Sequence, residues 1–493
     1  MNQERENSSE TSGRAKVLRL WQMIFLGKGT LTRQFIHALI SIALRLFFRR
    51  IEAVDAERVP KTGAIIFVLN HPNGLVDPAL VFVSLIRRVS FLAKSTLYAN
   101  PVGAFLLRTF EILPVYRRID AEAKTQSNTS TFENCFELLG RGRCIAIFPE
   151  GISHDETKLQ PIKTGAARIA LGAVGRRMKD EGGGISDEIG ESSLIPPPSS
   201  LKIMAVGLYY TSKTSFRSEA LIRYGEIFDV EAVELDENGE PPRDAVLQLT
   251  GKIENALKNV TLNLETQDEL ETVVKAEALF SSVYENLLFK QTLTQNFERL
   301  QNLASRYKLL GENEPEKMLR LNEKITAYET KLKTSGITGE SLSVLQHPTA
   351  YVFRFLILRI VFLFALALPA IVGAIVHSPA FLFSHFLALM FKTHGADAAG
   401  SSSKILAACI FMPLTWLATA LTMLYFFNWQ IALLSVPATI LCGYIALRWF
   451  ETLVDMRVWL NSAWLLFRQR ALFLRLLLQR KTLQKEIEEI IEQ

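Results

Sequence analysis

The sequence contains few cysteines and lacks the common short motifs of soluble enzymes. Its cysteines are 135, 144, 409 and 442, and none of them forms a CxxC pair or a zinc-type spacing, which indicates buried thiols in a reducing compartment. There is no GxSxG nucleophile elbow, GxxxxGK phosphate loop, GxGxxG fingerprint or HExxH metal motif. These absences exclude the common hydrolase, NTPase, dehydrogenase and metalloprotease classes. We expect no metal and no resident cofactor.

The charge balance also lacks the basic excess that nucleic-acid binding requires. The chain has 55 Lys and Arg against 50 Asp and Glu, a net charge of +5, so we expect no nucleic-acid partner. Basic residues instead cluster beside apolar stretches, at 45–50 and 468–481, which suits membrane lipids as partners, although solvated helix ends give the same pattern. Residues 1–30 lack the basic start and apolar core of a signal peptide and are expected to be disordered.

The texture of the chain changes along its length. Hydrophobic residues make up 49% of the 493 residues and concentrate after about residue 350, which indicates more than one unit. Residues 31–50 form a short apolar segment that ends in basic residues, and we expect an interfacial membrane-anchor helix. In residues 51–265, apolar runs alternate with helical patterns, which predicts an α/β domain with a mixed, largely parallel sheet covered by helices. Residues 266–346 are charged and amphipathic, and predict a helical hairpin packed on that domain, with a dimerising coiled coil as the less supported alternative.

Residues 347–447 have the composition of a transmembrane region, and 448–493 that of an amphipathic basic tail. The candidate spans are residues 353–376, 405–427 and 431–447, and the last two carry no charge. A further apolar stretch, residues 379–391, could insert partway. The number and parity of the spans therefore stay open.

The most informative local motif is NHPNGLVDP, residues 70–78. His71 follows a predicted buried strand, and Asp77 precedes Pro78 and a run of helix formers. A strand-to-helix turn can bring the two side chains together, so that Asp77 orients the imidazole and leaves its other nitrogen as a general base. Such a base would remove a proton from a hydroxyl that attacks an acyl carbonyl. The alternative is structural, with Asp77 as a helix N-cap before proline.

A second motif, FPEGISHD, follows another predicted strand. Glu150 is expected either to accept hydrogen bonds from a polyol or to fix the loop. Gly151 frees the backbone after it, and Ser153 and His154 add polar groups. On this basis we include all four residues among the candidates for substrate binding.

Two further features suit a phosphate group. Lys163 stands just before a helix expected to begin near Gly165, and a lysine beside a helix N-terminus makes a good anion site. Arg117 and Arg118 end the predicted strand ILPVYRR, where paired guanidinium groups could grip a phosphate. An incidental surface lysine and a solvated strand end are the structural alternatives.

The motifs NHPNGLVDP, ILPVYRR, FPEGISHD and IMAVGLYY occur in this order along the chain. That order resembles the four-block pattern of the glycerolipid acyltransferases, the glycerol-3-phosphate and lysophosphatidate acyltransferase superfamily, over roughly residues 50–265. The stretch FPEGISHDETKLQPIKTGAARIA and the later TVVKAEALF look closest to the fungal-type glycerol-3-phosphate/dihydroxyacetone-phosphate acyltransferases.

The resemblance implies catalytic roles for His71 and Asp77, a phosphate-gripping role for Arg117 and Arg118, and a substrate block at residues 149–151. It implies transfer of a fatty acyl group from acyl-CoA, or acyl-carrier protein, to the sn-1 hydroxyl of glycerol 3-phosphate in phospholipid synthesis. The alternatives are sn-2 acylation of lysophosphatidate and a non-catalytic membrane scaffold. We expect an integral membrane protein whose catalytic domain faces the cytoplasm, at a bacterial inner membrane or the endoplasmic reticulum.

The chain departs from the family pattern in three places. Five residues separate His71 from Asp77, where most members have four. Ile152 and Ser153 stand where many lysophosphatidate enzymes have Thr-Arg, so that arginine contact does not carry over. The fourth block, which the resemblance ties to the acyl donor or the membrane, falls on residues 205–207 and has Ala205 where proline is common.

Overall fold

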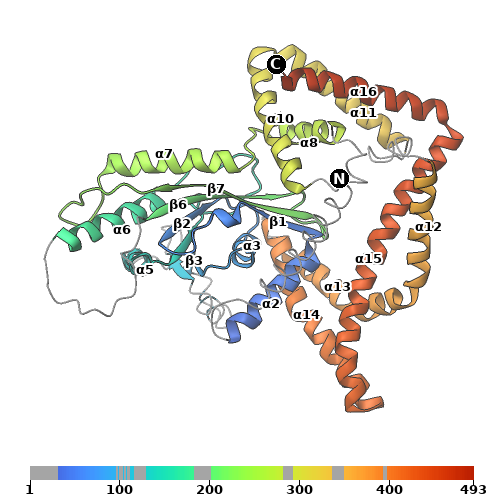
Figure 1. The fold of residues 1–493 in the computed structure, drawn as a ribbon, viewed down its shortest axis with the longest axis horizontal. Helices are drawn as coiled ribbons and strands as arrows, with labels where there is room; N and C mark the ends of the chain where they lie inside the picture. The colour runs from blue at the N-terminus through green and yellow to red at the C-terminus, as the bar shows by residue number, and fades with distance from the viewer. Residues whose placement is uncertain are drawn as a thin grey trace, which may run out of the picture. The chain divides into compact units, whose positions relative to one another are not determined.

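The computed structural model describes residues 31–95, 98, 104, 107, 112–115, 129–182, 201–280, 292–335, 349–391 and 397–492. The chain forms two compact units, the first comprising residues 1–261 and 394–405 and the second residues 262–393 and 406–493. Figure 1 shows the fold of each.

The first unit is built on a seven-stranded sheet with the order β1-β7-β6-β2-β5-β3-β4. β6 and β7 are antiparallel, and every other neighbouring pair is parallel. The predicted mixed, largely parallel sheet is therefore confirmed. The strands are β1 (Arg50–Val54), β2 (Ile65–Leu69), β3 (Val89–Lys94), β4 (Leu113–Val115), β5 (Cys144–Ile147), β6 (Lys202–Tyr210) and β7 (Glu219–Asp229).

The central strand β2 is apolar along its whole length. All five of its residues are buried, because helices cover both faces of the sheet. Ile65, Phe67 and Leu69 join the core cluster that includes residues of α2 (Leu31–Phe47) and α3 (Val76–Ser84). Ile66 and Val68 join the opposite cluster, with residues of α5 (Thr129–Gly140), α6 (Gly165–Gly182) and α7 (Arg243–Val260). In Figure 1, α6 and α7 lie on one side of the sheet and α3 on the other.

The fourth sequence block lies inside this sheet. Ala205 and Val206 are buried in β6, and Gly207 faces the end of α7, where a Cβ atom would overlap the carbonyl of Val260. Glycine is required there because strand and helix approach so closely. This interior position does not fit the direct contact with donor or membrane that the resemblance implied for residues 205–207.

Two strands, β1 and β7, were not predicted. β1 is an edge strand, RIEAV, whose Arg50 contacts both Glu52 and Glu219 at 3.3 Å. Helix α2 precedes it within the segment expected to be an interfacial anchor. The end of α2 belongs to the α/β core, since Leu44, Phe47 and Phe48 are buried, whereas Phe35 is 70% exposed. Membrane anchoring by residues 31–50 stays a prediction.

The second unit contains a helical bundle. Helices α8 (Gln267–Phe280), α10 (Leu293–Asn313) and α11 (Pro315–Thr334) pack with the C-terminal α16 (Arg470–Glu492). The apolar stripe of α16 is buried at Phe473, Leu476, Leu483 and Ile487. The second unit thus joins the predicted helical region and part of the predicted tail in one bundle, and packing of these helices on the α/β domain stays a prediction.

In the described part of the chain, four apolar helices lie between α11 and α16, namely α12 (Thr349–Ala365), α13 (Ala367–Phe391), α14 (Asp397–Phe426) and α15 (Trp429–Arg468). By length and composition, two stretches among the described residues could cross a membrane, Ala367–Phe386 and Trp429–Arg457. The expected span 353–376 is wrong in its bounds, because a helix boundary at Leu366 interrupts it. Residues 379–391 continue α13, and the expected boundary at 447 falls inside α15.

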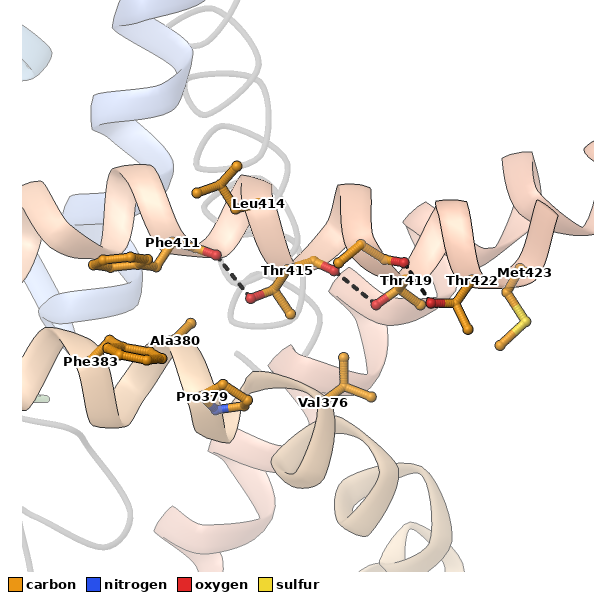
Figure 2. A pocket seen from close by; sticks show the side chains of 11 residues that line it. Val376, Pro379, Ala380, Phe383, Phe411, Leu414, Thr415, Thr419, Thr422 and Met423 are labelled. Carbon is orange, nitrogen blue, oxygen red and sulfur yellow. Dashed lines mark hydrogen bonds between the residues drawn. The ribbon is translucent and has the colours of Figure 1, made fainter. Parts of the chain in front are cut away.

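A groove of about 520 Å³ lies between α13 and α14. Figure 2 shows its lining, with Pro379 and Phe383 on α13 facing Phe411 and Thr415 on α14. The hydroxyls of Thr415, Thr419 and Thr422 each donate to a carbonyl of their own helix, at 2.8 to 2.9 Å. Because these hydroxyls are satisfied within the helix, the groove presents a largely apolar surface.

Candidate active site

The turn between β2 and α3 brings His71 and Asp77 together. His71 Nδ1 donates to Asp77 Oδ2 at 2.8 Å. The Asp77 side chain has no exposed surface, whereas that of His71 is 18% exposed. Across the described ranges, no residue is hydrogen-bonded to the other ring nitrogen, Nε2. An oriented imidazole with a free Nε2 is the arrangement that a general base needs.

Asp77 is held by two further donors. The backbone N–H of Asn73 donates to Oδ2 at 2.7 Å, and the hydroxyl of Tyr210 donates to Oδ1 at 2.5 Å. Burial and the adjacent carboxylate raise the pKa of Tyr210 well above its usual value, so this hydroxyl keeps its proton. The helix-cap alternative is wrong, because the N-cap of α3 is Leu75, without a side-chain cap, and Asp77 lies within the first turn.

The surroundings of His71 fix its ring and its main chain. The ring stacks on Phe148 with centroids 4.0 Å apart and an interplanar angle of 21°. Just before it, the Asn70 side chain exchanges two hydrogen bonds with the backbone of Leu208, at 3.0 and 2.8 Å. These bonds join the ends of β2 and β6, and so bring Tyr210 to Asp77.

The carboxylate of Glu150 is turned inward. Oε1 accepts from the backbone N–H of His71 at 3.0 Å, and Oε2 accepts from Gln160 N at 2.8 Å and His154 Nε2 at 2.5 Å. Its side chain has no exposed surface. Of the two functions expected for Glu150, the structure shows the loop-fixing one.

Lys163 lies where an anion could bind. Gly151 has a φ of +73°, and a Cβ atom at that position would overlap the Lys163 ammonium. The Lys163 backbone N–H donates to Pro149 O at 2.9 Å, and α6 begins at Gly165, as expected. Lys163 and Ser153 are exposed. The ammonium and the start of α6 therefore sit beside the turn that carries Glu150.

Arg117 and Arg118 lie outside the described residues. Conversely, the structure adds Tyr210, Phe148 and Lys213, which the sequence did not single out. Lys213 donates to Asp155 Oδ1 at 2.9 Å and to the carbonyl of His154 at 3.2 Å. Tyr210 ends the strand that pairs with β2, so knowledge of that pairing would have found it. Among the described residues, no group of three His, Cys, Asp or Glu could hold a metal ion.

Comparison with known protein families identifies two regions. Residues 50–185 match the Acyltransferase family, and residues 278–493 match the Glycerol-3-phosphate acyltransferase 2 C-terminal domain. The first match lies within the unit that holds the His71 turn, and the second covers most of the helical second unit.

Curated relatives agree with these matches. Glycerol-3-phosphate O-acyltransferase 2 of Saccharomyces cerevisiae is 29% identical over 263 residues, which cover 53% of this chain and 32% of that protein. Glycerol-3-phosphate O-acyltransferase 1 of the same yeast is 26% identical over 426 residues, covering 68% and 52%. A chloroplastic 1-acyl-sn-glycerol-3-phosphate acyltransferase from Brassica napus is 26% identical over 131 residues, covering 26% and 36%. The chain thus spans a third to about half of the yeast relatives.

A solved structure, the lysophosphatidate acyltransferase PlsC from Thermotoga maritima, aligns with a TM-score of 0.30 and 16% identity, covering 50% of this chain and 90% of that one. The family matches and the ordered motifs carry the assignment. The chain therefore carries an Acyltransferase-family domain at residues 50–185 and a C-terminal domain of the Glycerol-3-phosphate acyltransferase 2 type at residues 278–493.

Proposed function

We propose that this chain transfers a fatty acyl group from acyl-CoA, or acyl-carrier protein, to the sn-1 hydroxyl of glycerol 3-phosphate. The observation that carries the proposal is the 2.8 Å contact between His71 Nδ1 and the buried Asp77, which leaves Nε2 open. The contact lies in an acyltransferase domain, and an acyl transfer to a hydroxyl needs such a base.

In the proposed reaction, His71 Nε2 takes the proton of the acceptor hydroxyl as its oxygen attacks the thioester carbonyl. Asp77 stabilises the imidazolium that forms, and Asn73 N and Tyr210 keep the carboxylate aligned. Collapse of the tetrahedral intermediate forms the ester and breaks the C–S bond. The imidazolium then gives its proton to the departing thiolate, which restores neutral His71.

The phosphate of the acceptor would bind at Lys163, beside Gly151 and the start of α6. An ammonium next to free helical N–H groups attracts a phosphate from two sides. Arg117 and Arg118 are proposed as further phosphate ligands, on the strength of the family resemblance. Ser153 is exposed next to this position and is proposed to contact the glycerol.

Glycerol 3-phosphate is favoured over lysophosphatidate by the comparisons. Relatives named for the first acceptor align over 263 and 426 residues, against 131 for the Brassica enzyme named for the second. The match of residues 278–493 points the same way. Lysophosphatidate remains the second candidate because the Brassica relative is named for that acceptor.

We further propose that the protein is integral to a membrane, with the catalytic unit facing the cytoplasm, at a bacterial inner membrane or the endoplasmic reticulum. Two apolar helices of sufficient length support membrane insertion. A site at the interface would reach acyl-CoA and release a lipid product directly into the membrane.

An acceptor screen tests the proposal. Purified full-length protein, with radiolabelled palmitoyl-CoA, would be given glycerol 3-phosphate, dihydroxyacetone phosphate and lysophosphatidate in parallel. Labelled lysophosphatidate formed from glycerol 3-phosphate is the expected product. Preferential formation of phosphatidate would support the second candidate, and no consumption of acyl-CoA with any acceptor would support a non-catalytic scaffold.

A further inference from the structure

The turn at residues 150–154 forms hydrogen bonds with both main-chain polar groups of His71. Glu150 Oε1 accepts the backbone N–H of His71 at 3.0 Å, and the backbone N–H of His154 donates to the His71 carbonyl at 3.2 Å. Both polar groups of one residue are therefore held by one short segment. This fixes the main chain from which the imidazole projects, independently of the contact between the ring and Asp77.

Glu150 cannot play this part and also serve as a substrate ligand. Both of its oxygens are occupied by donors from the protein, and its side chain has no exposed surface. A polyol could reach this carboxylate only if the groups that bury it moved away and left their own N–H donors unpaired, which is costly. The carboxylate is therefore part of the support for the site.

His154 holds Glu150 in place. Its Nε2 donates to Glu150 Oε2 at 2.5 Å, and its Nδ1 is buried with no hydrogen-bond partner among the described residues. The side chain is 14% exposed. Lys213 fixes the same segment from the other side by donating to the His154 carbonyl at 3.2 Å. His154 and Glu150 thus form a second histidine–carboxylate pair behind the first.

We infer that His154 is a positioning residue: through Glu150 it holds the main chain of His71 so that Nε2 meets the acceptor hydroxyl. The inference rests on the proposed function and revises the expectation that Glu150 and His154 bind substrate. Pre-organisation of this kind acts on the chemical step, because a displaced base loses alignment with the proton it must take. It has little effect on acceptor affinity, which depends on groups that touch the acceptor.

Two near-isosteric variants test this. The amide nitrogen of glutamine can occupy the position of a histidine Nε2, whereas that of the shorter asparagine cannot reach it. We expect His154→Asn to lower kcat by about ten-fold or more, with KM for glycerol 3-phosphate within about two-fold of the wild-type value. His154→Gln should restore most of the lost kcat. The neighbouring exposed Glu156→Gln is the control, and thermal unfolding of each full-length variant checks folding.

The inference would be overturned if His154→Asn raised KM with kcat unchanged, which would make His154 a substrate ligand. It would also fail if both variants matched the wild type, or if glutamine gave no rescue. Proton NMR of histidine-labelled full-length protein tests the positioning role of His154 separately from the proposed acyltransferase function. The downfield signal expected of the His71 Nδ1–H bonded to Asp77 should shift or broaden in His154→Asn and persist in His154→Gln. This readout applies even if the wild type acylates no glycerol 3-phosphate.

Discussion

At the scale of single residues, the His71–Asp77 pair depends on a tyrosine from another strand. The hydrogen bond from the Tyr210 hydroxyl to the Asp77 carboxylate is buried and has a charged acceptor. Hydrogen bonds of this class contribute roughly 1.5–3 kcal/mol to stability. Tyr210→Phe leaves Oδ1 without this donor. We predict a fall in kcat on the order of ten-fold and a lower unfolding temperature, with KM for acyl-CoA little changed. Steady-state kinetics and thermal unfolding check it, and Tyr307→Phe in α10 serves as the control.

The pKa of Tyr210 gives a pH prediction with a definite sign. The folded state raises this pKa well above about 10, the ordinary value, so the folded protein keeps a proton that the unfolded chain loses. The resulting stability is fully present below about pH 10 and is lost as the pH rises further. Unfolding by denaturant between pH 9 and 11 should show a steeper loss for the wild type than for Tyr210→Phe. Equal slopes would contradict it.

The residues of the site were predictable to different degrees. The closeness of His71 and Asp77 followed from a strand-to-helix turn, which is a local feature. The inward turn of Glu150 did not follow, because one of its donors is the backbone N–H of His71, which lies 79 residues away in the chain. Tyr210 was missed for the same reason: its position depends on the pairing of β6 with β2.

At the scale of elements, apolar strands were predictable and polar edges were not. The central strands β2, β5 and β6 are apolar runs in the sequence. The edge strand β1 contains charged residues, and its Arg50 forms an ion pair with Glu219 of β7, so the sequence pattern did not mark it as a strand. The amphipathic pattern of residues 266–346 predicted helices but not the element against which their apolar faces pack. Any helix with an apolar stripe could cover those faces, and in the structure α16 does so.

The end of α2 is held by one side chain. Arg217 Nη1 donates to the carbonyls of Arg45, Leu46 and Phe48 at 3.0 to 3.2 Å, which occupies acceptors that a helix end leaves free. Arg217→Ala should accelerate amide hydrogen exchange over residues 44–48 by about ten-fold or more, since losing the bonds costs about 1–3 kcal/mol. Arg58→Ala, an exposed arginine, is the control. Unchanged exchange would show that packing alone holds the helix.

Helices α13 and α15 approach closely at a glycine. A Cβ atom at Gly373 would overlap the backbone of Cys442, and neighbouring His377 accepts from Trp416 Nε1 at 3.1 Å. Gly373→Ala should therefore lower the unfolding temperature in detergent, by an amount equivalent to about 1–3 kcal/mol. Gly251→Ala in α7 is the matched control, because a Cβ there meets no atom within 4 Å. Alanine at that helical position should stabilise by roughly 0.5–1 kcal/mol.

At the scale of the whole molecule, two family matches fall on two structural units. The Acyltransferase match, residues 50–185, contains the His71 turn and the Glu150 turn, and the second match, residues 278–493, covers most of the helical unit. The change in composition near residue 350 predicted an apolar region. Composition could not locate helix boundaries such as the one at Leu366, because the apolar sequence continues across that boundary.

The central claim is that His71 is the base for acylation of glycerol 3-phosphate. The most direct measurement is the initial rate of acyl transfer from labelled palmitoyl-CoA to glycerol 3-phosphate by the full-length wild type, His71→Ala and the control His385→Ala. We predict that His71→Ala loses at least about 10²-fold of the rate, with an unchanged unfolding temperature, while His385→Ala retains it. A folded His71→Ala protein with a near-normal rate would contradict the account.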